Sequence, residues 1–184
     1  MQLINRILFK ISSYLRCRVI RGPNHEAYLE RYHLLRLPFG IHLYLHRFVA
    51  SDPGRALHNH PWHSAISLVL SGQYMETRLG SSQQNNDLIK RMIKAGNVNY
   101  INGKIYHRIN LQQNEEVWTL FIHTASHRSW GFLNTENRQF SYSDHNQKIK
   151  SASNPMWWNT ALRPRNNPEM RSLMNSKSDQ HLFS

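Results

Sequence analysis

The sequence predicts a mainly β protein, built as a sandwich or barrel of short antiparallel strands and preceded by one amphipathic helix. Three observations support this prediction. Short β-rich segments recur between residues 41 and 133, turn signals separate them, and hydrophobic residues make up 40% of the 184-residue chain. Several short strands at regular spacing are typical of β-sandwiches and barrels. The length suits one domain with a substantial core.

The first element is the helix. Its apolar residues recur at helical spacing, namely Leu3, Ile4, Ile7, Leu8, Ile11 and Leu15. Arg6 and Lys10 interrupt them and no small-residue cleavage site follows, so we do not expect a signal peptide. We expect the helix to pack on its own domain. Its basic polar face leaves contact with a membrane surface open as the alternative. Residues 21–33 are interpreted as a loop or short helical turn.

The strands come next. An Asn102-Gly103 pair between two β-rich segments is a strong signal for a hairpin turn. From about residue 134 the composition becomes polar and basic, which predicts an irregular extension whose last ten to twenty residues are disordered. The regions are therefore a helix and connector (1–32), a β domain (33–133) and an extension (134–184). We expect strands at residues 41–49, 64–72, 74–80, 88–96, 98–111, 116–124 and 129–133.

The charge lies at the two ends of the chain. The net charge is +12, but residues 22–147 contribute only +3 of it. Basic ends fit solubility, and we do not expect nucleic-acid binding. The lone Cys17 excludes an intrachain disulfide and is compatible with a cytoplasmic location. No run of about 18 apolar residues occurs, so no transmembrane helix is expected.

Histidines dominate the segment "LHNHPWHS", which holds His58, His60 and His63. Residues i and i+2 of a strand face the same side, so His58 and His60 are expected to point together. If the strand resumes in register after Pro61, that face continues as Ile66, Leu68 and Leu70.

His107 lies between Ile105 and Ile109, again on an apolar face. Neutral imidazole suits Fe, Zn, Ni and Cu and, less well, Mn. A metal site at His58, His60 and His107 is therefore predicted, and a set of hydrogen-bonded core histidines is the alternative.

Two motifs resemble those of the cupin superfamily. The first is "GRALHNHPWHSAISLVLSG" and the second is "GNVNYINGKIYHRIN". The resemblance covers roughly residues 35–132, and similar "HPW…WTLF…WGF" patterns occur in bacterial and phage cupin-like proteins. It implies an antiparallel jelly-roll barrel with a metal in its mouth, and a homodimer. The matching positions are Gly54, His58, His60 and Gly72, then Gly96, Gly103, His107 and Asn110.

One departure from the cupin pattern decides the expected ligand set. The usual glutamate ligand falls near Ser64 or Ala65, neither of which can replace it. The three-histidine site that remains resembles that of thiol dioxygenases in the same superfamily. This implies one divalent transition metal, with Fe(II) favoured over Zn, Ni or Mn, and a small anionic substrate. His63 is interpreted as a surface residue or a base behind the ligands rather than a fourth ligand.

Tyr74, Glu76 and Arg78 alternate along one predicted strand. If they point inward, they are candidates for catalysis together with His63, and Arg78 would hold a substrate carboxylate. The alternative is a salt bridge on the outer face. The best hypothesis is an Fe(II)-dependent oxygenase. The rivals are a binding module whose basic ends contact nucleic acid or membrane, and a metal-free cupin of the sugar-epimerase type that uses a histidine as base.

Overall fold

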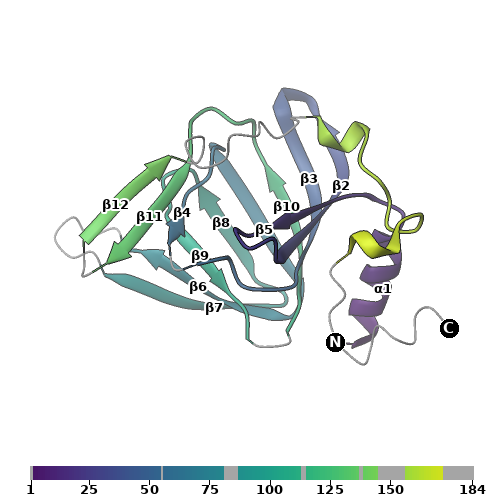
Figure 1. The fold of residues 1–184 in the computed structure, drawn as a ribbon, viewed down its shortest axis with the longest axis horizontal. Helices are drawn as coiled ribbons and strands as arrows, with labels where there is room; N and C mark the ends of the chain where they lie inside the picture. Colours follow the sequence, from purple (N-terminus) through teal and green to yellow (C-terminus); the bar gives the residue numbers. More distant parts are fainter. Residues whose placement is uncertain are drawn as a thin grey trace.

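Two six-stranded antiparallel sheets form the body of the protein (Figure 1). The computed structural model describes residues 2–54, 56–80, 87–112, 115–136, 139–144 and 156–171. The first sheet contains, in spatial order, β1 (Arg16–Arg21), β2 (Ala27–Leu37), β3 (Ile41–Phe48), β10 (Val117–His123), β5 (Ser64–Ser71) and β8 (Val98–Asn102). The second contains β12 (Gln139–Asp144), β11 (Gly131–Glu136), β4 (Leu57–His58), β9 (His107–Asn110), β6 (Gln73–Leu79) and β7 (Leu88–Lys94). The predicted mainly β, jelly-roll-like architecture is confirmed.

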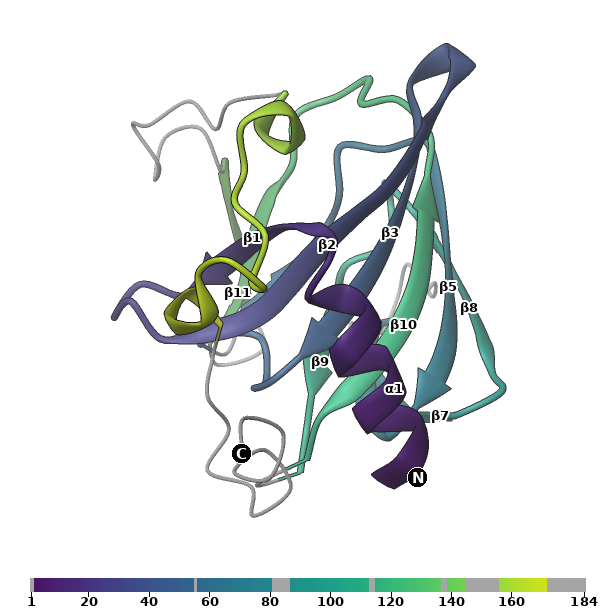
Figure 2. The ribbon, with the colours of Figure 1, turned by 90° about the vertical axis from the view of Figure 1, so that its right-hand side faces the viewer.

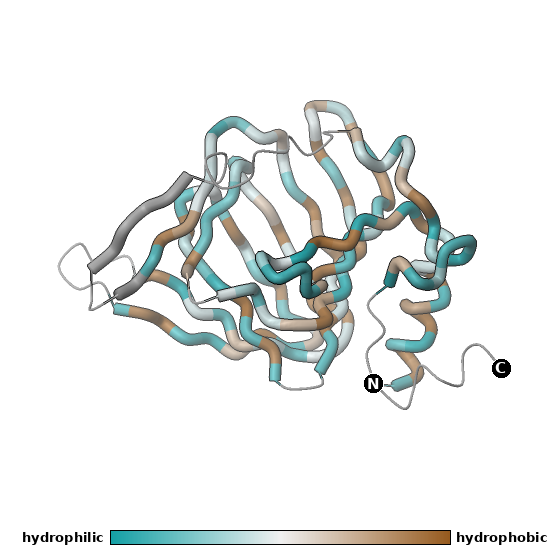
Figure 3. Tube along the Cα trace, in the orientation of Figure 1, coloured by the Kyte–Doolittle hydropathy of each residue, from teal (hydrophilic) through white to brown (hydrophobic). Residues whose placement is uncertain are grey.

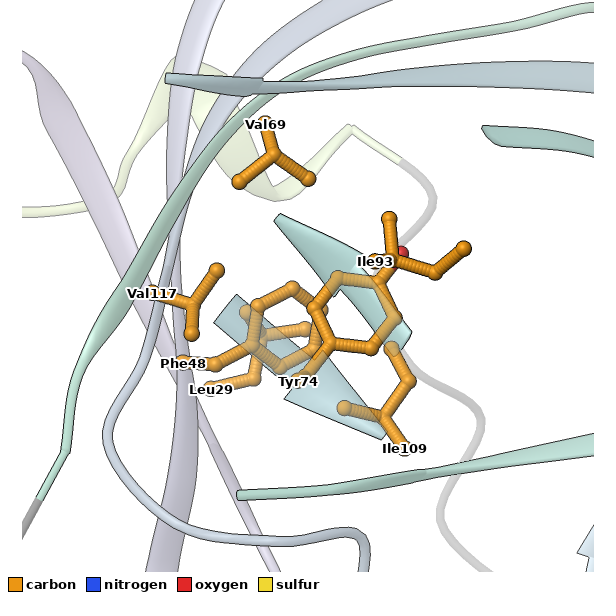
Figure 4. Packing of buried hydrophobic residues seen from close by; sticks show 7 residues of the cluster. All are labelled: Leu29, Phe48, Val69, Tyr74, Ile93, Ile109 and Val117. Carbon is orange, nitrogen blue, oxygen red and sulfur yellow. The ribbon is translucent and has the colours of Figure 1, made fainter. Parts of the chain in front are cut away.

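The space between the sheets is apolar at one end. A cluster of buried residues there draws on both sheets (Figure 4). Alternation along each strand places these side chains on the inner faces, as the pleat requires. The cluster consists of Leu29, Phe48, Val69, Tyr74, Ile93, Ile109 and Val117.

The inner face of β5 differs from the predicted one. Its buried residues are Ala65, Ser67, Val69 and Ser71, whereas Ile66 is 44% exposed. The strand does not resume in register with His58 and His60, because five residues separate the end of β4 from the start of β5. A shift of one residue in a strand exchanges its two faces. The strand ends at Ser71, and Gly72 directly after it adopts a positive φ of 82°.

The helix α1 (Gln2–Ser12) lies against the outer face of the first sheet (Figure 2). Phe9 packs there with Tyr32, Leu45 and Trp118. The helix is shorter than the apolar spacing suggested, since Leu15 already lies beyond it. None of the described helices is long and apolar enough to cross a membrane.

Both predicted region boundaries fall inside strands. β2 crosses the expected boundary between residues 32 and 33, and β1 begins as early as Arg16. The interpretation of residues 21–33 as a loop or helical turn was wrong, because pairing of β1 with β2 and of β2 with β3 builds this segment into the first sheet. Pairing outweighs the weak local preference of such a segment.

At the other end of the chain, β11 continues to Glu136 and β12 follows it, so the extension is not irregular throughout. Two 3-10 turns, η2 (Trp157–Asn159) and η3 (Pro168–Met170), then lie near the N-terminal segment. The Cys17 N–H donates to Leu162 O at 3.0 Å. Most of the stretch predicted to be disordered, residues 172–184, is outside the described residues. A remaining short 3-10 turn, η1 (Pro38–Gly40), joins β2 to β3.

Candidate metal centre

His58 and His107 lie directly opposite each other on paired strands. β4 runs antiparallel between β9 and β11, and the register pairs His58 with His107. Directly opposite residues of an antiparallel pair bring their Cβ atoms to about 4.5–5.5 Å. The two imidazole centroids accordingly lie 4.9 Å apart. Strand pairing alone therefore joins the two sequence motifs.

His60 completes the cluster from just beyond the end of β4. Its Nε2 lies 2.9 Å from His107 Nε2. One ring nitrogen of each of His58, His60 and His107 can be chosen so that all three lie within 4.8 Å of one another. The predicted convergence of these three side chains is confirmed. The metal itself stays a prediction at this point.

The residue between the two histidines holds the segment in place. Asn59 is buried, its Oδ1 accepts the Gly131 N–H at 2.8 Å, and its Nδ2 donates to Gly103 O at 3.2 Å. Gly103 must be a glycine here, because a Cβ would lie 2.8 Å from His60 O and 2.5 Å from Trp62 O. Sequence reasoning assigned no role to Asn59, although its place between the two histidines was visible.

Glu76 lies behind His107. Its Oε1 is 2.8 Å from His107 Nδ1, and its Oε2 lies 2.9 Å from Arg78 Nε and 2.7 Å from Arg91 Nη2. Burial opposes ionisation of this carboxyl, but the hydrogen bond and charge of His107 and the two arginines outweigh it and hold the Glu76 pKa well below its usual range. An ionised carboxylate only accepts hydrogen bonds, so His107 Nδ1 carries the proton of this contact, and Nε2 of the same ring faces His60.

Burial also keeps the other two histidines neutral. It lowers the pKa of both His58 and His60 well below the usual value, and the charge of His107 lowers each further. Asp52 Oδ2 lies 3.9 Å from His58 Nδ1 and accepts the Ile109 N–H at 2.7 Å. Burial raises the pKa of Asp52 to about 6, and that backbone hydrogen bond opposes the rise.

This donor set fits a divalent transition metal. Three imidazoles face one another, burial lowers the pKa of His58 and His60, and metal-binding histidines characteristically donate their second N–H to a carboxylate, as His107 does to Glu76. Two donors about 2.1 Å from one ion lie roughly 3–3.5 Å apart, close to the His60–His107 separation. The His58 side chain remains 16% exposed, so the cluster can be reached from solvent.

The two motifs thus meet on facing strands within two antiparallel sheets. The chain has a cupin-type fold. No family model and no curated protein matches the sequence. Among solved structures, an oxalate oxidase in complex with the substrate analogue glycolate is 22% identical with a TM-score of 0.39, over 50% of this chain and 46% of the other. The chain therefore spans about half the length of that neighbour.

Two further structural neighbours are similar over comparable stretches. Hydroxypropylphosphonic acid epoxidase from S. wedmorenis is 12% identical with a TM-score of 0.42, over 59% of this chain and 55% of the epoxidase. KdgF from Halomonas sp. is 16% identical with a TM-score of 0.40, over 53% of this chain and 79% of KdgF.

The remaining predicted site residues divide into two groups. Tyr74, Glu76 and Arg78 do point inward from β6, so the alternative of an outer-face salt bridge was wrong. Arg78, however, is already engaged. It pairs with Glu76 and donates from Nη2 to Asn99 Oδ1 at 2.7 Å and to a backbone carbonyl at 2.8 Å. The Tyr74 hydroxyl accepts a hydrogen bond from the Asn99 amide at 3.1 Å.

His63 is not brought to the cluster. It is exposed, its Nδ1 lies 3.1 Å from Ser64 Oγ, and its ring is near that of His127. Of the readings open for His63, the structure favours a surface residue. Ser64 and Ala65, where the usual glutamate ligand was expected, begin β5 and are not part of the cluster.

Arg31 is the site residue that sequence reasoning missed. It is opposite His46 in the β2–β3 register, and its Nε donates to His46 Nε2 at 3.1 Å. Its guanidinium lies 5.3 Å from the centre of the Tyr44 ring. Among the described residues no carboxylate pairs with it. The ring of its partner His46 stacks on Phe121 with centroids 4.7 Å apart, so Arg31 lies on the inner face of the first sheet. Its charge also contributes to the lowered pKa of His60.

Aromatic rings surround the cluster on the His60 side. Trp62 stacks on His60 with ring centroids 4.5 Å apart. His123 in turn stacks on Trp62, with ring centroids 4.4 Å apart. Trp130 lies within 6.5 Å of both His58 and His60. Trp62 thus forms an apolar wall beside His60, whereas Trp118 packs on the outer face beneath α1.

Proposed function

We propose that this cupin is a metal-dependent enzyme, an Fe(II) oxygenase that acts on a small anionic substrate. The observation that supports it is the convergence of three imidazoles, one of them backed by an ionised carboxylate. Three neutral ligands leave the full positive charge of a divalent ion uncompensated, and they leave coordination positions open, as a catalytic site requires. Zn, Ni and Mn are the alternative ions for this donor set.

His58, His60 and His107 would hold the ion. When bound, Fe(II) supplies one-electron chemistry with dioxygen, which amino-acid side chains lack. Glu76 holds the His107 proton on Nδ1 and so keeps Nε2 free as a donor. Trp62 covers one face of His60 and limits access of water from that side.

Arg31 is the residue we assign to the substrate anion, in place of Arg78. Arg78 has its donors directed at Glu76, Asn99 and Tyr100. Arg31 uses only Nε within the described part of the chain, and both Nη groups have no partner there. A guanidinium with two parallel N–H donors binds a carboxylate or phosphate in bidentate fashion. An unpaired cation close to a +2 centre selects for anions.

The test is elemental analysis of protein purified without an affinity tag, beside a His58→Ala/His107→Ala variant. We expect about one transition-metal ion per wild-type chain and none in the variant. Reconstitution with Fe(II) under anaerobic conditions, followed by oxygen-uptake assays over a panel of small carboxylates and phosphonates, then tests the reaction. Zinc or nickel that Fe(II) cannot displace would argue against the oxygenase. No metal in the wild type after reconstitution would overturn the proposal.

The His107–Glu76 pair also supports a second candidate, a metal-free acid–base enzyme. A histidine held by a buried carboxylate is a competent general base, and a short Nδ1–Oε1 contact orients it. In that case the chelator-treated protein keeps its activity and metal addition changes neither its stability nor its turnover. The metal-dependent proposal requires the reverse on both counts.

A further inference from the structure

The helix α1 turns its apolar side away from the protein. Its exposed residues include Leu3 (70% exposed), Ile4 (48%), Ile7 (49%) and Ile11 (52%). These four residues recur at helical spacing and form one stripe, which we call the α1 stripe. A helix on a globular body normally buries such a stripe against the core. In α1, by contrast, the stripe faces away from the core.

Specific contacts fix this orientation. Ser12 is fully buried and donates to Phe9 O at 3.0 Å, and Phe9 is the apolar residue that the helix does bury. Arg171 donates to Phe9 O at 3.1 Å and to Ser12 Oγ at 2.9 Å. The Phe9 ring lies between two guanidinium groups, 4.0 Å from that of Arg171 and 4.8 Å from that of Arg47. These contacts prevent the helix from rolling its stripe inward.

The surroundings of the α1 stripe are basic. Arg6 and Lys10 are exposed and, at 3.6 residues per turn, fall along one edge of the stripe. Residues 1–21 hold five basic and no acidic side chains. At the end of the stripe, the Arg165 guanidinium lies 5.0 Å from the centre of the half-exposed Tyr14 ring. Two further basic residues, Arg16 and Arg163, line a shallow cavity of about 330 Å³ beside Tyr14.

We propose that α1 docks the protein on an anionic lipid surface, with the α1 stripe inserted among the headgroups and the basic side chains paired with lipid phosphates. Apolar residues on one side and cations along its edge are the features of an interfacial helix. The helix has 11 residues and is about 16 Å long, so it lies in the interface and does not span the roughly 30 Å hydrocarbon core. Figure 3 shows its alternating apolar and polar turns at the edge of the molecule.

Charge favours an anionic membrane over a second copy of the chain as the partner of the α1 stripe. Pairing two α1 stripes would bring two acid-free, +5 segments together and create repulsion. An anionic membrane instead attracts juxtaposed basic residues, each by about 1 kcal/mol or roughly fivefold in binding. The stripe and the charge therefore favour the same partner.

The experiment is co-sedimentation of the full chain with vesicles of phosphatidylcholine alone and of equimolar phosphatidylcholine and phosphatidylserine. We expect sedimentation with the mixed vesicles only, and a loss in 1 M salt. Ile7→Gln/Ile11→Gln should weaken binding about tenfold or more by removing inserted apolar area. Arg6→Gln/Lys10→Gln should weaken it by about 30-fold.

The matched control is Leu88→Gln/Met92→Gln, which removes two exposed apolar side chains beside lysines on β7 of the second sheet. It should bind vesicles as the wild type does. Near-UV circular dichroism checks that every variant is folded. Equal sedimentation of the wild type with both vesicles, or no effect of the Ile7/Ile11 substitutions, overturns the proposal. So does a dimer in light scattering that these substitutions dissociate without any vesicle binding.

Discussion

Glu76 Oε1 lies 2.8 Å from His107 Nδ1, while Nε2 of the same ring lies 2.9 Å from His60 Nε2. One side chain of β9 thus connects an ionised carboxylate on β6 to the histidine of the first motif. Because the carboxylate only accepts, the position of the His107 proton follows from the position of Glu76. The missing glutamate ligand of the first motif has a counterpart here that acts behind the ligands rather than among them.

Glu76→Gln tests that relationship. A glutamine can still accept the Nδ1 proton but no longer carries the charge that makes the imidazole a stronger donor. We expect metal affinity to fall about 10- to 100-fold, measured by competition with a chromophoric chelator. The unfolding free energy should also fall by about 3 kcal/mol, because Arg78 loses its charged partner.

Glu116→Gln is the matched control for this change. Glu116 pairs with buried Arg47 at 2.6 Å, beneath α1 and away from the histidines. It should lose stability to a similar extent and keep its metal affinity. Equal metal affinity in both variants would show that Glu76 does not act through His107.

Arg31 and Arg47 provide a second contrast, since both belong to the first sheet, Arg31 half-buried on β2 and Arg47 buried on β3. Arg47 pairs with Glu30 and Glu116, whereas Arg31 has no carboxylate partner among the described residues. Arg47→Gln should cost about 3–5 kcal/mol, because it removes the cation that balances the charges of Glu30 and Glu116. Arg31→Gln should cost less than about 1 kcal/mol, because it removes an unpaired cation and a glutamine can still donate to His46.

The same variant should lose anion binding. We expect acetate, glycolate and phosphate to raise the midpoint of thermal unfolding of the metal-loaded wild type and not of Arg31→Gln, while Arg78→Gln keeps part of the effect. A destabilised Arg31→Gln protein that retains the anion-induced shift would contradict both the structural and the functional assignment.

The histidine cluster could be predicted from the sequence because it depends on local spacing. His58 and His60 are two residues apart, and His107 alternates with buried Ile109. The pairing of β4 with β9 then brings His107 opposite His58. Arg31 could not be predicted in this way, because nothing local to "LERYH" indicates an inner face. Its position depends on β2 joining the sheet beside β3, and the pattern of the β2 segment did not predict a strand.

The predicted register of β5 failed for a related reason. Period-2 alternation fixes two faces but does not tell which of them is inner. The apolar residues Ile66 and Leu68 favoured one face, whereas the buried face carries Ser67, which is 5% exposed. The rule that the more apolar face of a strand is buried therefore fails for β5, whose inner face carries small and polar residues.

Asn59 is predicted to position the two histidines that flank it. Asn59→Ala removes the acceptor of the Gly131 N–H and the donor to Gly103 O, both inside the protein. Leaving buried backbone groups unpaired costs about 1–3 kcal/mol each. We expect a loss of about 2–4 kcal/mol in urea unfolding, together with at least about tenfold weaker metal binding, because the segment between the two histidines loses its side-chain hydrogen bonds to Gly131 and Gly103.

Asn59→Asp separates the two effects. An aspartate keeps the acceptor for Gly131 and loses the donor to Gly103, so an intermediate loss of metal affinity is expected. Full affinity in Asn59→Ala would mean that strand pairing of His58 alone positions the ligands.

His123 is expected to make the protein sensitive to acid. Burial and the charge of Arg31 lower the pKa of His123 to about 4, despite a hydrogen bond to Thr124 O at 2.6 Å that opposes the shift. The pKa of the folded state lies below the ordinary value of 6.5, so the unfolded chain binds more protons between these values. The unfolding free energy therefore falls as the pH drops from 6.5 toward 4, by about 3 kcal/mol from this residue. Asp52 opposes this trend, because its pKa is raised to about 6 and its protonation stabilises the folded state below that pH.

His123→Gln removes only the histidine contribution and keeps a donor for Thr124 O. In urea unfolding of metal-free protein, the wild type should lose about 3 kcal/mol more than the variant between pH 6.5 and 4. Parallel stability curves for the two proteins would show that His123 is protonated without cost in the folded state.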